Sequence, residues 1–303
     1  MLATDRKILL TNERESVYPA ASESENRRMK FQRIIETVYF QPWSITRDGW
    51  MAVHKILAPH LAGKEPPKIK ADDGETDFFG NAIPKMQITP EGVAIIPVIG
   101  TLIHHASLMD KLCGACSYDD VKNDLRDALG QANLKKIVLH IASPGGMCMG
   151  ATETAELITQ IREMGYRIEA VTDELIGSAA YYLAAGCDKI SCTPSALVGS
   201  IGTFAAILDE SLAFEMEGLK LEVIKSGEFK GAGIPGTKLS DAQRAEMQSR
   251  VDLYAKLFRD HVSKYRPVID AADMQGQAFI GAEAVALGFA DAVIDDVRDG
   301  FSL

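Results

Sequence analysis

Short, strongly apolar strands alternate with amphipathic helical segments from Pro90 onward, and this alternation constrains the fold more than any other feature of the chain. Strands are predicted at 93–99, 137–141 and 167–172, with helical segments between them. Because these strands are apolar along their whole length, they suit a mostly parallel sheet whose two faces are both covered. The sequence therefore predicts an α/β fold.

Capping residues and shorter apolar runs predict the remaining elements. Ser117 and Ser240 would each cap a helix, the first ending near residue 131 and the second near residue 265. The turn at 143–146 leads into a helix that ends near residue 164, and another helix opens at Gly177 and Ser178. Short strands are expected at 190–192, 223–224 and 292–294, and a short helix at 281–287.

Composition shifts divide the chain into five parts. Residues 1–30 are polar and charged and are interpreted as a flexible arm. Residues 31–62 would form a small helical appendage with two short helices around Pro42, and the proline-rich segment 63–90 would be a linker. The main domain is expected at 91–295, followed by a tail at 296–303.

Charge and hydropathy exclude several function classes. The net charge of −10 makes the chain a poor partner for nucleic acid or for an anionic membrane surface. No apolar stretch approaches the roughly 20 residues that a bilayer requires, so we expect no membrane anchor and a cytoplasmic location. The 5 cysteines are an odd number and are expected to be reduced, with Cys113 and Cys116 as small apolar fillers or, alternatively, a redox pair.

The sequence motifs exclude the common hydrolase classes and give no support for a cofactor-binding site. HExxH, GxSxG and Ser-x-x-Lys are all absent, and no cluster of histidines and carboxylates predicts a metal site. His140 lies inside an apolar strand and is interpreted as a core histidine. Gly231-Ala232-Gly233-Ile234-Pro235-Gly236 fits GxGxxG, but no strand precedes it and no helix follows, so a glycine-rich loop is predicted. We therefore expect no cofactor and no metal.

Ser178 is the candidate nucleophile, because it would begin an apolar helix directly after a strand, where backbone amides favour developing negative charge. The alternative is an ordinary capping serine. The turn Ser143-Pro144-Gly145-Gly146 also lies between a strand and a helix. Its glycines would let backbone amides approach a substrate carbonyl, as an oxyanion hole requires, although such a turn can equally be a simple connection.

A serine nucleophile needs a base, and with the histidines poorly placed a lysine from segment 225–230 is the candidate. The amine must lose its proton, so its pKa of about 10.4 would have to fall by roughly 3 units. Such a lysine has to be enclosed. The alternative is an exposed loop lysine.

These blocks resemble the signal peptide peptidase A and phage prohead protease family of Ser/Lys peptidases. The likeness extends from about residue 93 to 295 and includes Gly177-Ser178-Ala179-Ala180-Tyr181-Tyr182, Gly199-Ser200-Ile201-Gly202 and the segment ending in Phe229-Lys230. It implies a Clp protease/crotonase-like fold, a repeated ββα superhelix, with the small N-terminal helical appendage.

The resemblance also implies a role for each matching residue. Ser178 would be the nucleophile, Lys230 the general base and Ser200 the serine that orients the lysine. Gly146, with Gly145 and the Ser178 amide, would form the oxyanion hole. Lys225 is the rival base, but the family's lysine falls three residues after a loop glycine, here Gly227.

The absence of an N-terminal anchor favours the phage branch, which implies cleavage of scaffold or capsid proteins, at small residues, in the host cytoplasm or inside the procapsid. It also implies a homo-oligomer with active sites shared between subunits. Three alternatives remain: a cytoplasmic signal peptide peptidase-like protease that degrades peptides, a crotonase-like acyl-CoA enzyme, and a non-catalytic component of capsid assembly.

Overall fold

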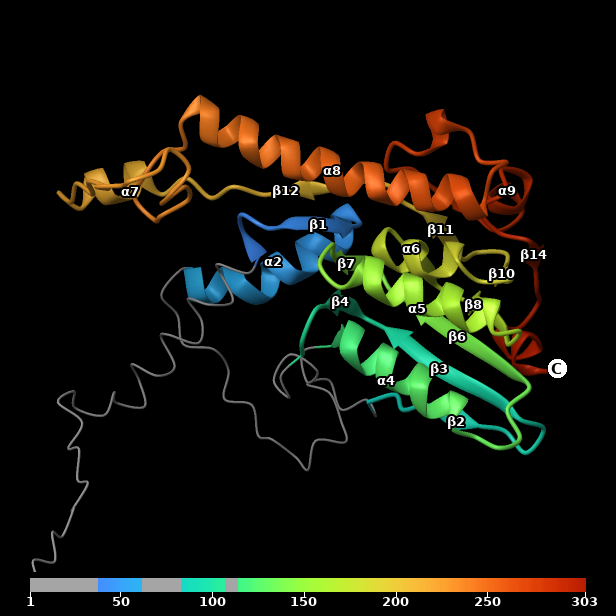
Figure 1. The fold of residues 1–303 in the computed structure, drawn as a ribbon. Helices are drawn as coiled ribbons and strands as arrows, with labels where there is room; N and C mark the ends of the chain where they lie inside the picture. Colours follow the sequence, from blue (N-terminus) through green and yellow to red (C-terminus); the bar gives the residue numbers. More distant parts are fainter. Residues whose placement is uncertain (1–37, 62–82, 107–113) are drawn as a thin grey trace, which may run out of the picture. The chain divides into compact units, whose positions relative to one another are not determined.

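A six-stranded, almost entirely parallel sheet organises the chain, and a computed structural model describes residues 38–61, 83–106 and 114–303 (Figure 1). The strand order is β14-β10-β8-β6-β3-β2, and only β2 is antiparallel to its neighbour. The strands are β2 (Gln87–Ile88), β3 (Val93–Ile99), β6 (Lys136–Ala142), β8 (Arg167–Thr172), β10 (Lys189–Cys192) and β14 (Ala292–Val293). The predicted strands at 93–99 and 167–172 are confirmed at both ends.

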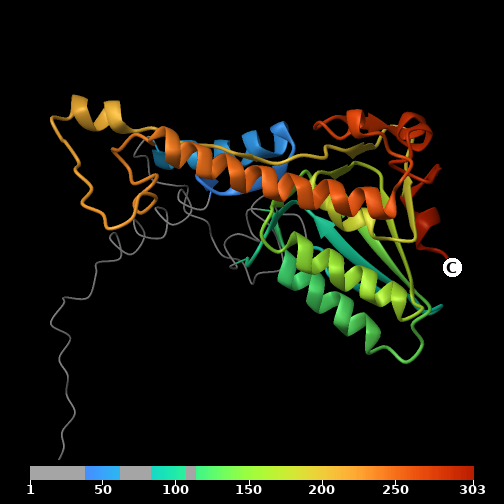
Figure 2. The same cartoon turned by 45° about the horizontal axis from the view of Figure 1, so that its top comes forward.

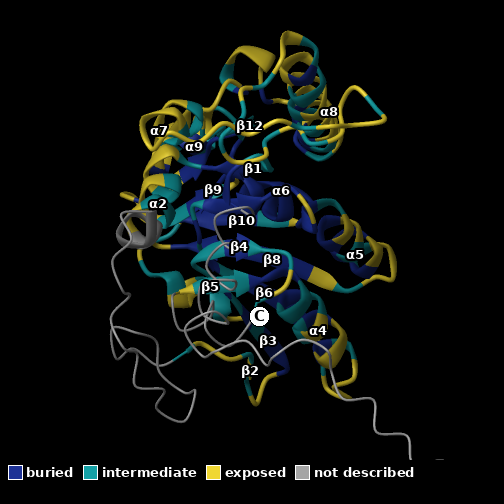
Figure 3. Ribbon diagram, turned by 90° about the vertical axis from the view of Figure 1, so that its left-hand side faces the viewer, coloured by how far each residue is buried: buried dark blue, intermediate teal, exposed yellow. Residues whose placement is uncertain are grey.

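Helices cover one face of this sheet. α4 (Tyr118–Leu129) and α5 (Ala151–Glu163) pack on β3 and β8 and lie side by side in Figures 1 and 2. α6 (Ala179–Ala185) packs beside α5, and α8 (Asp241–Tyr265) packs on α6. Alternate residues of β6, Ile137, Leu139 and Ile141, are fully buried in the same core as Leu125 of α4 and Ile158 of α5. Figure 3 shows this core in dark blue, while exposed residues concentrate on α7 (Ser211–Met216) and the outer side of α8.

The opposite face of the sheet has a thinner cover than the sequence predicted. Val138 and Val171 pack there against Phe301 of a 3-10 turn, η2 (Val297–Phe301), instead of against a long helix. His140 is on the same face, its ring 5.5 Å from the ring of Phe301, and 24% of its side chain is exposed. The interpretation of His140 as a core histidine is therefore wrong, because in the described part of the chain this face is covered by η2, which leaves part of the ring exposed.

Two smaller sheets complete the mixed α/β fold. The five-stranded sheet has the order β12-β1-β7-β4-β5, and the three-stranded sheet the order β13-β11-β9. Their strands are β1 (Pro42–Ile45), β4 (Thr101–Ile103), β5 (Ala115–Ser117), β7 (Gly145–Met147), β9 (Leu175–Gly177), β11 (Leu197–Gly199), β12 (Phe204–Ala205) and β13 (Ala278–Ile280). The remaining elements are α2 (Arg47–Leu61), α9 (Gly281–Ala286) and η1 (Ala271–Asp273).

The segment around Pro42 agrees with its prediction in part. Of the two short helices expected there, one forms after Pro42 as α2, whereas residues 42–45 form β1, which pairs with β7 on one side and β12 on the other. Trp43 is 1% exposed and Ile45 is also buried, so burial between two strands outweighs local helical periodicity. Pro42 begins the strand, where a missing N–H is tolerated. Residues 31–37, the arm at 1–30 and most of the predicted linker lie outside the described residues, and the five-part domain division stays a prediction.

The helix caps agree with the sequence, whereas one predicted strand does not form. The Ser117 hydroxyl accepts the Asp119 amide, and Ser240 forms a reciprocal capping box with Gln243. Residues 223–224 have no regular structure, and Ile224 is 97% exposed. An apolar run without a partner strand cannot satisfy a ladder of backbone hydrogen bonds, so this prediction is wrong. Among the described residues, no helix combines the length and hydropathy needed to cross a membrane.

Candidate active site

Ser178 stands at a sharp turn between β9 and α6, with φ 51° and ψ −115°. A non-glycine residue at positive φ costs on the order of 1–3 kcal/mol, so the surrounding structure must enforce this conformation. The side chain is 1% exposed, makes no capping bond, and its Oγ has no hydrogen-bond partner in the part of the chain that the structure describes. Ser178 thus occupies the N-cap position of α6, but its side chain does not cap the helix.

Ser200 accompanies Ser178 in one cavity. Gly177 of β9 is paired with Gly199 of β11, so the two serines follow matching positions of adjacent parallel strands. Ser200 also has positive φ, at 61°. Both serines line a cavity of about 530 Å³, together with Ile45, Arg47, Trp50, Met51, Gly202, Thr203, Phe204, Gln275 and Gly276.

The predicted oxyanion turn lies against Ser178 because Ser143 holds it there. The Ser143 hydroxyl donates to the Gly100 carbonyl at 2.7 Å and accepts the Gly145 amide at 3.2 Å. The Gly177 amide donates to the Ser143 carbonyl at 2.9 Å, which fixes the turn to the residue before Ser178.

Neither turn glycine leaves room for a side chain. Gly145 has φ +94°, and a Cβ there would lie 2.3 Å from the Ser44 carbonyl oxygen and 2.8 Å from the Ala179 amide nitrogen. A Cβ at Gly146 would lie 1.8 Å from the Leu102 carbonyl oxygen. Close backbone approach therefore requires glycine at both positions.

Two of the three predicted oxyanion donors have acceptors within or next to the turns that carry them, whereas Gly146 is paired with Ser44 of β1. The Gly145 amide donates to Ser143, and the Ser178 amide donates to the Gly199 carbonyl at 2.7 Å. Ala179, whose amide nitrogen lies beside Gly145, is the residue that sequence reasoning missed. Its position directly after the candidate nucleophile is the sequence feature that could have identified it.

The structure does not bring Lys230 into the Ser178 cavity. Lys230 is exposed, its amide donates to the Gly227 carbonyl at 3.1 Å, and it is not among the residues that line the cavity. Lys225 is also exposed, with Nζ donating to the Glu228 carbonyl at 2.7 Å. Residues 231–236 form turns without a preceding strand or a following helix, which confirms that the GxGxxG match is a loop.

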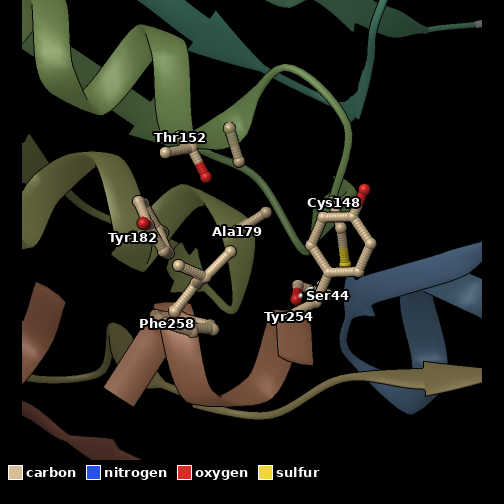
Figure 4. A pocket seen from close by; sticks show the side chains of 9 residues that line it. Ser44, Cys148, Thr152, Ala179, Tyr182, Tyr254 and Phe258 are labelled. Atoms are coloured by element: carbon tan, nitrogen blue, oxygen red, sulfur yellow. Dashed lines mark hydrogen bonds between the residues drawn. The ribbon is translucent and has the colours of Figure 1, made fainter. Parts of the chain in front are cut away.

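A second, much smaller cavity of about 10 Å³ lies beside Ala179, and Figure 4 shows its lining. The Ser44 hydroxyl hydrogen-bonds with Cys148 Sγ at 3.3 Å and with Thr203 Oγ1 at 3.0 Å. Burial raises the pKa of the Cys148 thiol to about 11, which outweighs the opposing effect of these hydroxyl contacts. Cys148 is thus a neutral thiol and not a nucleophile near neutral pH.

One group of potential metal ligands was not expected. One donor atom each of His104, His105 and Asp119 lie within 4.8 Å of one another, because β5 pairs with β4 and leads directly into α4. No cluster in the sequence predicted a metal site, because His104 and His105 approach Asp119 only when β4, β5 and α4 come together. The Lys122 ammonium pairs with Asp119 at 2.8 Å and competes with a cation for that carboxylate. Cys113 lies outside the described residues.

Comparison with known proteins gives consistent results. Residues 160–298 match "Peptidase family S49", a span that contains Ser178, Ser200 and Lys230. The chain is 30% identical over 206 residues to "Capsid assembly protease C" of Escherichia phage lambda, covering 67% of this chain and 47% of that protein.

Two further relatives extend the comparison. "Head-tail preconnector protein GP5" of Enterobacteria phage P21 is 28% identical over 233 residues, which cover 76% of this chain and 46% of that protein. "Probable protease SohB" of Haemophilus influenzae is 26% identical over 159 residues, 52% of this chain and 45% of that protein. The chain thus spans about half the length of these curated relatives.

Proposed function

The chain resembles the S49 peptidases, and from that premise we propose that it is a serine endopeptidase that uses Ser178 as nucleophile and Lys230 as general base. The observation that carries the proposal is the Ser178 side chain, which is buried, held at positive φ and without a hydrogen-bond partner in the described residues. An unsatisfied buried hydroxyl at a strained turn is costly, and catalysis gives a reason to retain it.

In the proposed reaction, Ser178 Oγ attacks a peptide carbonyl while its proton passes to the Lys230 amine. Lys230 then returns the proton to the leaving amine, and a water hydrolyses the resulting ester by the same route. Ser200, which lines the same cavity as Ser178, would orient the lysine. Gly146 would supply one oxyanion amide, and we place Ala179 beside it because the Gly145 and Ser178 amides are already bonded.

Within one chain, Lys230 is exposed and absent from the lining of the Ser178 cavity. A lysine base must lose its proton, which requires burial away from water. We therefore place Lys230 of a neighbouring copy in each active site, so that a homo-oligomer with shared sites both encloses the amine and completes the dyad.

The names of the phage relatives support capsid or scaffold proteins as substrates, with the reaction in the host cytoplasm or inside the procapsid. A signal peptide peptidase-like protease that degrades peptides is the alternative suggested by the SohB name and by "Putative signal peptide peptidase SppA" of Enterococcus faecium. The finer description of the fold as a Clp protease/crotonase-like superhelix belongs to the same proposal.

Complementation between two inactive variants tests the proposal. Ser178→Ala and Lys230→Ala should each fail to cleave denatured casein, and co-assembly of equal amounts should restore activity at about one quarter of the sites if the dyad is formed between chains. Normal cleavage by either single variant would contradict the dyad. No restoration in co-assembled oligomers would contradict sharing between chains.

The casein assay, together with a coenzyme A binding measurement and a labelling experiment, separates the remaining alternatives. A crotonase-like enzyme would bind coenzyme A and leave casein intact, and a non-catalytic capsid component would fail to label at Ser178 with a fluorophosphonate probe.

A further inference from the structure

β1 lies between two strands that both adjoin parts of the candidate active site. β7 contains the turn glycines Gly145 and Gly146, and β12 follows Ser200 by a few residues. β1 is antiparallel to both, and Figure 1 shows it between them. A peptide that adds a strand to such a site gains affinity from backbone hydrogen bonds and selectivity from pockets for alternate side chains. β1 is thus arranged as a bound peptide would be.

The register places one carbonyl of β1 at the proposed oxyanion donors. The Thr46 amide donates to the Pro144 carbonyl at 2.8 Å, and the Cys148 amide donates to the Pro42 carbonyl at 3.3 Å. Between these two contacts, the alternation of an antiparallel ladder makes Ser44 and Gly146 the hydrogen-bonded pair. This register makes the Ser44 carbonyl the expected acceptor of the Gly146 amide.

The second proposed donor, the Ala179 amide, lies near the same carbonyl. A Cβ built on Gly145 would approach both the Ser44 carbonyl oxygen, at 2.3 Å, and the Ala179 amide nitrogen, at 2.8 Å. The Ser44 carbonyl is consequently close to both amides that we assign to the oxyanion hole.

The residues on the two sides of the Ser44–Ile45 bond line different cavities. Ser44, 5% exposed, lines the cavity of about 10 Å³ formed with Cys148, Ala179 and Tyr182 (Figure 4). Ile45 lines the cavity of about 530 Å³ that contains Ser178. The first cavity has space for a small side chain only, whereas the second is wide.

We infer that the Ser44–Ile45 peptide bond is an internal cleavage site of this protein, presented to Ser178 by β1. The inference rests on the proposed function, since it uses the same nucleophile and base. It also defines the substrate class: an extended segment with a small residue immediately before the cleaved bond, because only about 10 Å³ of space remains beside the Ser44 side chain.

The step conserves atoms and protons. Ser178 Oγ bonds to the Ser44 carbonyl carbon, its proton passes through Lys230 to the Ile45 nitrogen, and the Ser44–Ile45 bond breaks. Water then hydrolyses the ester, which leaves a carboxylate at Ser44, an amine at Ile45 and a free Ser178 hydroxyl.

Intact mass and N-terminal sequencing of the full chain, incubated in its assembled state, test the inference. Wild type and Ser44→Ala should yield a species that begins at residue 45, whereas Ser178→Ala should yield none. Ser44→Phe should lose at least nine-tenths of this product. Ile45→Pro is a second blocking variant, because the ladder alternation directs the Ile45 amide away from β7 and the β7 hydrogen bonds survive the substitution.

Cleavage of denatured casein by the same wild-type sample distinguishes failure of the internal cleavage site from failure of the peptidase proposal. If casein is cut while the Ser44–Ile45 bond stays intact, the internal site is wrong and the peptidase proposal stands. If neither is cut, both are wrong. Efficient cutting of a folded Ser44→Phe protein at this bond would overturn the selectivity for small residues.

Discussion

Ser178 and Ser200 follow directly paired glycines of two adjacent parallel strands, and both have positive φ, 51° and 61°. The Ser178 amide donates to the Gly199 carbonyl at 2.7 Å, so the turns that carry the serines are hydrogen-bonded to each other. Because both serines line the same cavity, backbone strain is concentrated where the proposed chemistry takes place. The strain also makes stability and activity separable by mutation.

Replacing Ser178 with alanine should abolish cleavage and leave the protein as stable as wild type or more stable. The substitution removes a buried hydroxyl without a partner in the described residues, which favours the folded state by about 1 kcal/mol. The unfolding free energy of Ser178→Gly should exceed that of Ser178→Ala by roughly 1 kcal/mol, because glycine accepts positive φ without strain. Urea unfolding of the three proteins measures both effects, and a loss of stability in Ser178→Ala would contradict them.

Replacing Ser143 with alanine should act in the opposite direction on stability. The variant leaves the Gly100 carbonyl and the Gly145 amide without their partner, at a cost of about 1–3 kcal/mol. The turn beside Ser178 loses its anchor, so kcat/KM should fall as well. Ser302→Ala, which removes one exposed hydroxyl contact, serves as the control in the same unfolding assay. Equal stability of the two variants would argue against the anchoring role.

A methyl group at Gly146 should be far more disruptive than one at Gly227. The Gly146 Cβ would overlap the Leu102 carbonyl in the middle of the sheet, and rigid backbone cannot retreat, so we expect a loss of more than about 3 kcal/mol or no folded protein. Gly227→Ala meets only the flexible Lys230 side chain at 3.6 Å and should leave the melting temperature nearly unchanged. Similar melting temperatures for the two variants would refute the close packing of β7 on β4.

His261 should make the fold less stable as pH falls. Burial, with a smaller contribution from the Lys264 charge, lowers the pKa of His261 from 6.5 to about 4. Since the unfolded state then binds the proton more readily, stability is fully present above pH 6.5 and is lost as pH falls toward 4, by roughly 3 kcal/mol at most.

His261→Phe keeps a ring stacked on Tyr182, where the present ring centroids are 4.4 Å apart, and removes the titrating group. The melting temperature of the variant should fall less steeply than that of wild type as the pH is lowered from about 6.5 to about 4. Parallel slopes would show that His261 does not account for this loss.

The parts of the fold that depend on local sequence were predictable. Capping by Ser117 and Ser240 uses hydrogen bonds to amides two or three residues away, and the strands at 93–99 and 167–172 are apolar runs bounded by turn residues. Ser178 was selected for the same reason, since its position between a strand and a buried helix is visible in the sequence alone.

Tertiary structure decided what local pattern could not. The choice between helix and strand at Pro42 depended on β7 and β12, which are distant in sequence, and the run at 223–224 found no partner strand. Which amides remain available beside Ser178 depended on Ser143 and Gly199, and the exposure of Lys230 depended on what surrounds it in space. Periodicity and caps are encoded within a few residues, whereas burial and hydrogen-bond pairing arise only when remote segments meet.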